Sequence, residues 1–368
     1  MKILLTNSTD IFAGGEDYVL TLARWLRKRG HAVWVSALPG HLLLAKCEEE
    51  EIPVVPVDYR GMSRVFEVSR ELRSHLRRLG IDVVHSNANY DRTCAAIAAV
   101  GLRTRHVAGI HSTHSIQHNI THWWRNRWGV DHFITDAEAG RAVLIQKDGI
   151  ARARITAVPI GIENEDAKQA AGARTAIRRE WGVGASALVV GNVARLVEFK
   201  GHRYLLETIA LVVKEVDDAW FPIVGDGELL DALQSQARGL GIESRVKFLG
   251  FQDHLENIYP GFDIYTHSSL ELAAEMFPIA ILRALGAGLP VVCTNVGGIA
   301  AMVREGESGF LVPPGDPPAL AAALVRVLLD ASLRGRMGKE SRALFEERYH
   351  ASAMAERVEG IYRAVCNH

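Results

Sequence analysis

Two basic residues follow a predicted strand at a spacing that suits the binding of an anion. Arg195 and Lys200 stand in NVARLVEFKGHRYLL, in the loop between an apolar strand and the next helix. Such loops present free backbone N–H groups and the positive end of the helix dipole. Arginine adds planar paired donors and lysine a compact charge. The pair is therefore either an anion site or two solvated surface cations, with neither alternative favoured by the local pattern.

A carboxylate and a guanidinium interrupt a segment that is otherwise apolar. In EMFPIAILRALGAGLPVV, Pro278 suits the first turn of a helix and apolar residues follow at helical spacing, so we expect a buried helix. Glu275 would lie just before its N-terminus, where it either accepts hydrogen bonds from ligand hydroxyls or caps the helix. Arg283 lies eight residues further on, a little over two helical turns, and therefore toward the same side.

Glycines mark two further turns between a strand and a helix. Gly14 and Gly15 either let a ligand approach the backbone or form a plain turn, and both interpretations stand. Gly225 lies in VGDGELL, which is not G-x-G-x-x-G and is followed by no clear acid for a ribose. At Gly225 the packing of a tight turn is therefore favoured over dinucleotide binding.

A histidine follows another predicted strand, in VAGIHSTHS. His111 would face the ligand or be a hydrogen-bonded packing residue. Its neighbours His114 and His118 suggest a metal, but no acid or cysteine stands at ligand spacing and the chain has no D-x-D pair. We therefore expect no metal site.

The composition is typical of a globular protein, and the net charge is too small to attract nucleic acid. Its 368 residues predict two domains, and 42 lysines and arginines against 43 acids leave a net charge of −1. Four scattered cysteines without a C-x-x-C pair favour the reducing cytoplasm. MKILLTN is predicted to be a strand rather than a signal peptide, and no apolar run of about 18 residues could span a membrane.

Strand and helix patterns alternate along the chain, which is typical of parallel sheets with crossover helices. The predicted strands include KILLTN, HAVWVSAL, IDVVHS, RHVAGIHS, VDHFITDA, SALVVGNVARL, WFPIVGDG, RVKFLGF, FDIYTHSS and PVVCTNVGG. They form two Rossmann-like halves, so ligands are expected at the carboxyl ends of the strands, in a cleft between the halves. The predicted segments are an N-terminal domain, a polar helical connector, a second domain and a helical tail, over residues 1–163, 164–185, 186–345 and 346–368.

Taken in order, these motifs resemble the retaining, nucleotide-sugar-dependent glycosyltransferases of family 4. That family has the GT-B fold, α/β with two Rossmann-like doubly wound domains facing a central cleft. The resemblance covers nearly the whole chain. It rests on the glycine pair, DVVH, the strand-end histidine, PIGIE, the R…K pair, VGDG, FLGF, FDIYTHSS, E-x-F-P…ALGAGLPVV and VGGI…GESGFLVPPGD.

The resemblance implies roles for these positions. Arg195 and Lys200 would hold the donor diphosphate, Glu275 would receive hydroxyls of the transferred sugar, and His111 would contact that sugar. Gly15 would approach the phosphate or the acceptor, and the last helix would cross back to the first domain. The catalytic set implied is Glu275, His111, Arg195 and Lys200. The donor-binding set implied is Gly14, Gly15, Arg195, Lys200, Gly225, Glu275, Phe277, Pro278, Ile279 and Arg283.

The chain departs from the family at one donor-binding position. Arg283 stands where the family usually has a second glutamate, which binds the ribose, and Ala300-Ala301 stands where a Pro-Glu pair is common. An arginine cannot accept a hydroxyl proton, so this ribose contact cannot form. Arg283 would instead meet an anion, either Glu271 or the donor phosphates.

The activity implied is a retaining transfer of a hexosyl or N-acetylhexosaminyl group, without metal or cofactor, from a nucleoside-diphosphate sugar. The acceptor would be a hydroxyl of a small molecule, a glycan or a lipid-linked glycan of the cell envelope, as in polysaccharide or lipopolysaccharide synthesis. Three alternatives remain open. They are a GT-B nucleotide-sugar epimerase, an inactive glycosyltransferase-like subunit, and a nicotinamide-dependent oxidoreductase that lacks its glycine fingerprint.

An aromatic and basic stretch, THWWRNRW, suggests peripheral contact with an anionic membrane. Trp123, Trp124 and Trp128 would lie at the lipid interface and the arginines at phosphates. A predicted basic helix would add Arg73, Arg77 and Arg78. A packed helix with a solvated basic face explains the stretch equally well. The location expected is cytoplasmic, at the inner face of the membrane.

Overall fold

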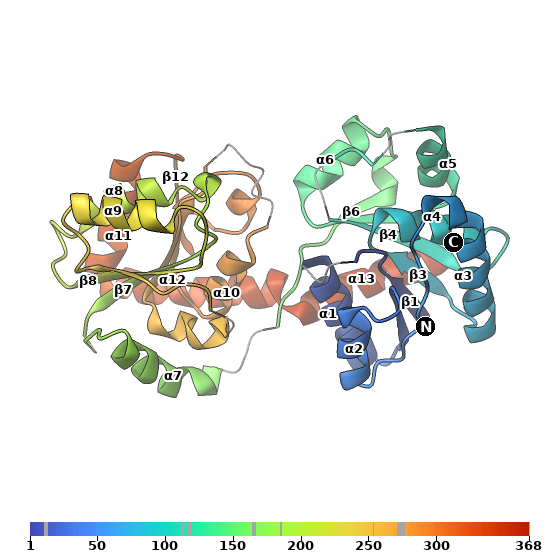
Figure 1. Cartoon of the computed structure of the whole chain (residues 1–368), viewed down its shortest axis with the longest axis horizontal. Coiled ribbons are helices and arrows are strands. Elements are labelled where there is room, and N and C mark those ends of the chain that lie inside the picture. The colour runs from blue at the N-terminus through green and yellow to red at the C-terminus, as the bar shows by residue number, and fades with distance from the viewer. Residues whose placement is uncertain are drawn as a thin grey trace. The chain divides into compact units, whose positions relative to one another are not determined.

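The computed structural model consists of two compact units, each built on one sheet (Figure 1). It describes residues 1–10, 14–111, 114–116, 119–163, 167–184, 186–252, 254–270 and 277–367. Unit 1 comprises Met1–Glu163 and Ala351–His368, and unit 2 comprises Asn164–His350. The sequence predicted boundaries after residues 163, 185 and 345.

Unit 1 contains a six-stranded parallel sheet in the order β2-β1-β3-β4-β5-β6. The strands are β1 (Lys2–Thr6), β2 (Ala32–Ser36), β3 (Val83–Ser86), β4 (Arg105–Ile110), β5 (His132–Thr135) and β6 (Ile155–Ala157). The helices are α1 (Gly14–Lys28), α2 (Leu42–Glu49), α3 (Val65–Leu79), α4 (Asn89–Ala99), α5 (Ile120–Trp128), α6 (Glu138–Gln146) and α13 (Ala351–Cys366). The strand order reverses between β1 and β3, so the crevice that binds ligands in such sheets is expected there.

Unit 2 repeats this architecture with the order β12-β11-β10-β7-β8-β9. Its strands are β7 (Leu188–Val193), β8 (Ala219–Val224), β9 (Val246–Phe248), β10 (Ile264–His267), β11 (Val291–Thr294) and β12 (Gly309–Val312). Its helices are α7 (Ala167–Glu180), α8 (His202–Val212), α9 (Leu230–Gly239), α10 (Ile279–Gly286), α11 (Pro317–Leu329) and α12 (Ala331–Leu344). Here the strand order reverses between β7 and β10.

The predicted strands are confirmed because parallel strands are buried on both faces and read as continuous apolar runs. In β1, Ile3 and Leu5 enter the apolar cluster that contains α1 and α13, whereas Leu4 enters the opposite cluster with α3 and α4. The sequence analysis did not predict α2, α6, α11 or β12, and of α12 it predicted only the last residues. Pro278 was expected inside the first turn of a helix; it is instead the cap residue before α10, with φ −65° and ψ 109°.

Helix α13 completes the core of unit 1, where it lies against α1 (Figure 1). Its Glu359 is buried and accepts hydrogen bonds from Arg29 and Arg363. Burial alone would raise the pKa of Glu359, but the two guanidinium groups lower it to about 2. Tyr362, on the same helix, lies 2.6 Å from His85 Nδ1 through its hydroxyl. The helix is therefore attached to the end of α1 by charge and to β3 by a hydrogen bond, in addition to its apolar packing.

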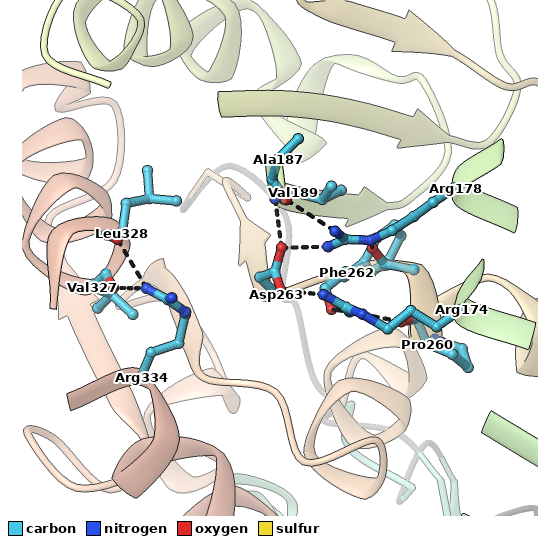
Figure 2. A network of polar contacts seen from close by, with 11 residues as sticks. Arg174, Arg178, Ala187, Val189, Pro260, Phe262, Asp263, Val327, Leu328 and Arg334 are labelled. Atoms are coloured by element: carbon cyan, nitrogen blue, oxygen red, sulfur yellow. Dashed lines mark hydrogen bonds and ion pairs between the residues drawn. The ribbon is translucent and has the colours of Figure 1, made fainter. Parts of the chain in front are cut away.

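The stretch predicted as a connector contains α7, which is anchored in unit 2 by one buried and one partly exposed ion pair. Figure 2 shows the guanidinium groups of Arg174 and Arg178 converging on the carboxylate of Asp263. The Arg178 side chain is only 4% exposed, and it also donates to the carbonyls of Gly261 and Ala187. Asp263 in turn accepts the backbone N–H of Val189 at the start of β7. The helix thus joins two strands of the sheet and is not a free linker.

We predict that Asp263→Asn lowers the free energy of unfolding by about 3–5 kcal/mol, because it leaves the buried Arg178 without its counter-charge. Urea titration of both proteins measures the difference. The matched control is Glu347→Gln, which removes an exposed partner of Arg304 and should cost less than about 1 kcal/mol. Equal effects of the two substitutions would contradict the anchoring role of Asp263.

Candidate functional site

The loop after β7 carries two cations close to one aromatic ring. Arg195 is exposed and Lys200 is partly buried. The guanidinium carbon of Arg195 lies 5.8 Å from the centre of the Phe199 ring, and Lys200 Nζ lies 5.1 Å from it. Cations are attracted to the face of such a ring. Phe199 therefore brings the two predicted phosphate ligands together at the carboxyl edge of the sheet.

This loop is held against the segment that follows β10 by close backbone packing. Gly201 has φ +68°, and a Cβ atom there would lie 2.1 Å from the carbonyl oxygen of Ser268. Ser268 Oγ donates to the carbonyl of Lys200 at 2.9 Å, and the N–H of Leu270 donates to that of Phe199 at 2.8 Å. Strands β7 and β10 are the pair between which the strand order reverses. The cations therefore stand at the position where doubly wound sheets bind ligands.

The loop after β8, which contains Gly225, packs against the loop after β7. Gly225 has φ +136°, and a Cβ atom there would lie 2.0 Å from the carbonyl oxygen of Ala194. At Gly227 the corresponding distance to the carbonyl oxygen of Leu196 is 2.4 Å. The predicted packing role of this turn is confirmed: both glycines let the loop after β8 pack against the residues on either side of Arg195. Binding of the donor by Gly225 itself stays a prediction.

The segment before α10 is described only from Phe277 onward. Phe277 packs edge-on against Tyr349, with 5.6 Å between ring centres, and Ile279 begins the helix behind Pro278. Glu275, the predicted acceptor of sugar hydroxyl hydrogen bonds, lies outside the described residues. Its role therefore stays a prediction.

Arg283 lies on α10, partly buried beside Tyr259. Burial raises the pKa of the Tyr259 hydroxyl, and the nearby charge of Arg283 opposes that rise. The rest of the helix is apolar and packed, with Ile281, Leu282 and Leu285 fully buried, so its register is fixed. Glu271, one of the two anions proposed for Arg283, lies outside the described residues.

In unit 1, Gly14 and Gly15 begin α1. A Cβ atom on Gly15 would lie 4.0 Å from Asn7 Nδ2, which is ordinary contact, so the space there is not restricted to glycine. Glu16 is buried and accepts hydrogen bonds from Asn7 Nδ2, at 2.9 Å, and from Thr9 Oγ1. This acid fixes the loop after β1 in addition to lying in the first turn of the helix.

His111 follows β4 and is held by residues at the ends of the neighbouring strands. Its Nδ1 lies 2.9 Å from Asp136 Oδ1, after β5, and its Nε2 lies 3.4 Å from Asn87 Oδ1, after β3. The ring of Tyr18 packs on the imidazole, with 4.6 Å between centres. The side chain is 17% exposed. Its orientation is therefore fixed while part of the ring stays open.

Asp136 also controls the charge of His111. Burial lowers the pKa of His111, but the charge and hydrogen bond of Asp136 more than offset this, so the pKa is raised above its usual value. Sequence reasoning missed Asp136. The available indication was its place in HFITDA, immediately after a strand that is adjacent to the one preceding His111.

Neither a metal cluster nor a membrane span appears in the part of the chain that the structure describes. No group of three His, Cys, Asp or Glu side chains there could hold a metal ion. Likewise, none of the described helices is long and apolar enough to cross a bilayer.

The two units and their polar strand-end loops define a doubly wound α/β protein, with predicted ligand residues at both points of strand reversal. Two family profiles match it: Glycosyltransferase Family 4 over residues 12–166, and Glycosyl transferases group 1 over residues 187–330. Together they cover most of the chain. The chain belongs to glycosyltransferase family 4, and its fold is GT-B, as predicted.

Similar proteins include curated enzymes of several specificities. The chain spans about half the length of relatives such as N-acetyl-alpha-D-glucosaminyl L-malate synthase of Bacillus anthracis, with 29% identity over 51% of this chain and 48% of that one. Phosphatidyl-myo-inositol mannosyltransferase of Mycobacterium leprae matches at 27% identity over 97% of this chain and 95% of its own.

Solved structures share the fold at low sequence identity. The chain of Anabaena HepE in complex with UDP superposes with a TM-score of 0.80 at 22% identity, over 99% of this chain and all of that one. A glycosyltransferase from Rickettsia africae gives a TM-score of 0.84 at 16% identity, over 99% of this chain and 98% of its own.

We predict that Asp136→Asn lowers the pKa of His111, because burial then acts on the imidazolium without its counter-charge. NMR titration of the imidazole protons measures this. In the wild type the raised pKa of His111 increases the free energy of unfolding. This contribution is fully present below about pH 6.5, the usual pKa of histidine, and is lost as the pH rises through the pKa of the folded state. Glu138→Gln, an exposed acid two residues on, is the control and should leave the pKa unchanged. The same pKa in all three proteins would exclude the coupling.

Proposed function

We propose that this protein transfers a sugar from a nucleoside-diphosphate sugar to a hydroxyl acceptor, with retention of configuration. The observation that carries this proposal is the loop after β7, in which Arg195 and Lys200 both lie near the ring of Phe199. Close packing at Gly201 holds this loop at the point where the strand order reverses, between β7 and β10. Two fixed cations at that place suit a diphosphate. Family membership and the likeness to a fold solved with UDP support this reading.

The chemistry follows from where charge develops. When the nucleoside diphosphate departs, negative charge appears on its β-phosphate, and Arg195 and Lys200 would stabilise it without a metal. We propose that the departing phosphate removes the proton of the acceptor on the same face of the sugar, which retains the configuration. Glu275 would accept hydrogen bonds from the sugar hydroxyls. His111, oriented by Asp136, would contact the same sugar.

The sugar and acceptor are proposed at the level of class. Relatives are named for transfer of N-acetylglucosaminyl, mannosyl and galactosyl groups, which supports a hexosyl or N-acetylhexosaminyl donor. One relative, from Escherichia coli, is named for a diphosphoundecaprenol-linked acceptor, and another for phosphatidyl-myo-inositol. We propose a glycan or lipid-linked glycan of the cell envelope as acceptor, reached from the cytoplasm.

Helix α5 suits peripheral contact with a membrane because most of its exposed side chains are large and apolar. Ile120 is 76% exposed and Trp128 is 62% exposed, and the indoles of Trp123 and Trp124 also reach the surface. The side chains that this helix buries are polar, namely Arg125 and Asn126. Tryptophan is favoured at the lipid headgroup level. We propose that this aromatic face rests on the membrane that carries the acceptor.

The structure corrects the part of the membrane hypothesis that concerns arginines. Arg125 is fully buried and donates to Asn89 and Thr93 of α4 and to the carbonyl of Ile116, so it cannot meet lipid phosphates. Arg73 donates to the carbonyls of Ala98 and Val100 at the end of α4. The remaining exposed cations of these two helices are Arg70, Arg77, Arg78 and Arg127. Binding is therefore proposed to depend more on the indoles than on charge.

We predict that vesicles containing anionic lipid pellet the protein, and that replacing Trp123, Trp124 and Trp128 by alanine reduces the bound fraction severalfold. Phe251→Ala removes a similarly exposed aromatic ring from unit 2 and is the control. Added salt should weaken binding only in part, because salt screens the charges and not the indole contacts. Absence of pelleting at low salt would contradict membrane contact.

We predict that Arg195→Ala and Lys200→Ala each weaken binding of a nucleoside diphosphate about tenfold or more, because a charged hydrogen bond contributes about 1.5–3 kcal/mol. A thermal-shift screen of nucleoside diphosphates selects the base, and calorimetry then measures the affinities. Arg203→Ala, an exposed arginine on α8, is the control. The proposed function fails if no nucleoside diphosphate binds the wild type, or if both variants bind it normally.

A further inference from the structure

Arg92 is a buried guanidinium whose hydrogen-bonding capacity is unused. It lies in the first turns of α4 and is only 4% exposed. Its Nε and Nη1 atoms are fully buried and have no hydrogen-bond partner among the residues that the structure describes. A charged donor left in this state costs free energy, because its buried N–H groups have lost water without gaining a hydrogen bond. Such a group in a native fold therefore calls for a ligand or another explanation.

The carboxylates nearest to Arg92 are committed to other donors. Asp91 accepts hydrogen bonds from Thr6 Oγ1 at 2.6 Å and from Ser8 Oγ at 3.0 Å, besides backbone N–H groups. Asp148 accepts from Ser115 Oγ and from the N–H of Ile116. Both acids raise the pKa of Arg92 through space, but burial is the larger effect and lowers it to about 10. Arg92 therefore remains a cation at neutral pH.

A second buried arginine of the same unit shows how a structural guanidinium is satisfied here. Arg125 donates to side-chain or carbonyl oxygens of Asn89, Thr93, Asn126 and Ile116. Its donors are thus matched with acceptors from α4, α5 and the segment before α5. Arg92 stands on the neighbouring helix without any comparable set, so a role in holding the fold does not account for it.

The position of Arg92 places it near the residues expected to meet the substrates. Helix α4 follows β3, so its first turns lie at the carboxyl edge of the sheet, beside the reversal point between β1 and β3. His111 Nε2 lies 3.4 Å from Asn87 Oδ1, and the N–H of Asn87 donates at 3.0 Å to Asp91, the residue before Arg92. His111 is the residue that we propose to contact the transferred sugar.

We propose that Arg92 binds an anionic group of the acceptor, a phosphate or a carboxylate. The planar guanidinium offers paired N–H donors that match two oxygens of either group. This inference rests on the proposed function, because it assigns the anion to the acceptor while the donor diphosphate is held by the loop after β7. It restricts the acceptor class from any hydroxyl compound to one that carries an oxyanion.

The test measures anion binding without requiring turnover. Inorganic phosphate is titrated by calorimetry into the full chain carrying Arg195→Ala and Lys200→Ala, so that the donor loop contributes nothing. We expect saturable binding, and at least a tenfold weaker affinity when Arg92→Gln is added. Arg103→Gln, an exposed arginine of the same unit, is the matched control and should leave the affinity unchanged. Methyl phosphate and L-malate, titrated in the same way, distinguish a phosphate from a carboxylate site.

The variant is also checked for an intact fold. In the chain with the donor loop unchanged, Arg92→Gln should bind the nucleoside diphosphate selected above as the wild type does, since that site belongs to unit 2. The proposal is overturned if phosphate, methyl phosphate and L-malate all fail to bind, or if they bind equally with and without Arg92. If the anions bind through Arg92 but no nucleoside diphosphate binds, the proposed glycosyl transfer fails while the anion site stands.

Discussion

The site that we propose for the donor depends on one contact between two stretches of backbone, Gly201 against the carbonyl of Ser268. Because a Cβ atom would lie 2.1 Å from that oxygen, only glycine permits the approach. The contact joins the loop after β7 to the loop after β10, which are the two loops at the strand reversal. The cations of one loop are thereby fixed relative to the segment of the other that leads toward Glu275. Gly225 and Gly227 extend the same close packing to the loop after β8.

Buried arginines serve two distinct purposes in this fold. Arg125 and Arg178 are surrounded by acceptors and attach α5 and α7 to the strands and helices beside them. Arg92 has the burial of these residues without their partners. The energetic cost of burying a cation is similar in each case, so the difference lies in what offsets it. For Arg125 and Arg178 the fold itself supplies the hydrogen-bond acceptors, and for Arg92 we propose that a substrate supplies them.

The fold could be predicted from the sequence, because strands buried on both faces appear as continuous apolar runs and glycine turns separate them from helices. The sequence was also sufficient to locate Arg195, Lys200 and His111 at strand ends. It did not reveal Asp136 or the partners of Arg178, because these contacts join residues 25 and 85 positions apart, and nothing local records the pairing. Arg125 was misassigned to the surface for the same reason: arginine beside exposed tryptophans resembles a solvated cation until its distant acceptors are known.

Helix α13 is far in sequence from the sheet that it completes. The core of unit 1 includes Met354, Val358 and Tyr362, packed with residues of β1 and α1. Unit 2, by contrast, is one uninterrupted stretch from Asn164 to His350. During synthesis on the ribosome, the second unit therefore has all of its chain available before the first can bury its last apolar surface. Until then the core beneath α1 and α2 stays partly exposed, and a nascent or truncated chain that ends before α13 would be a natural substrate for chaperones.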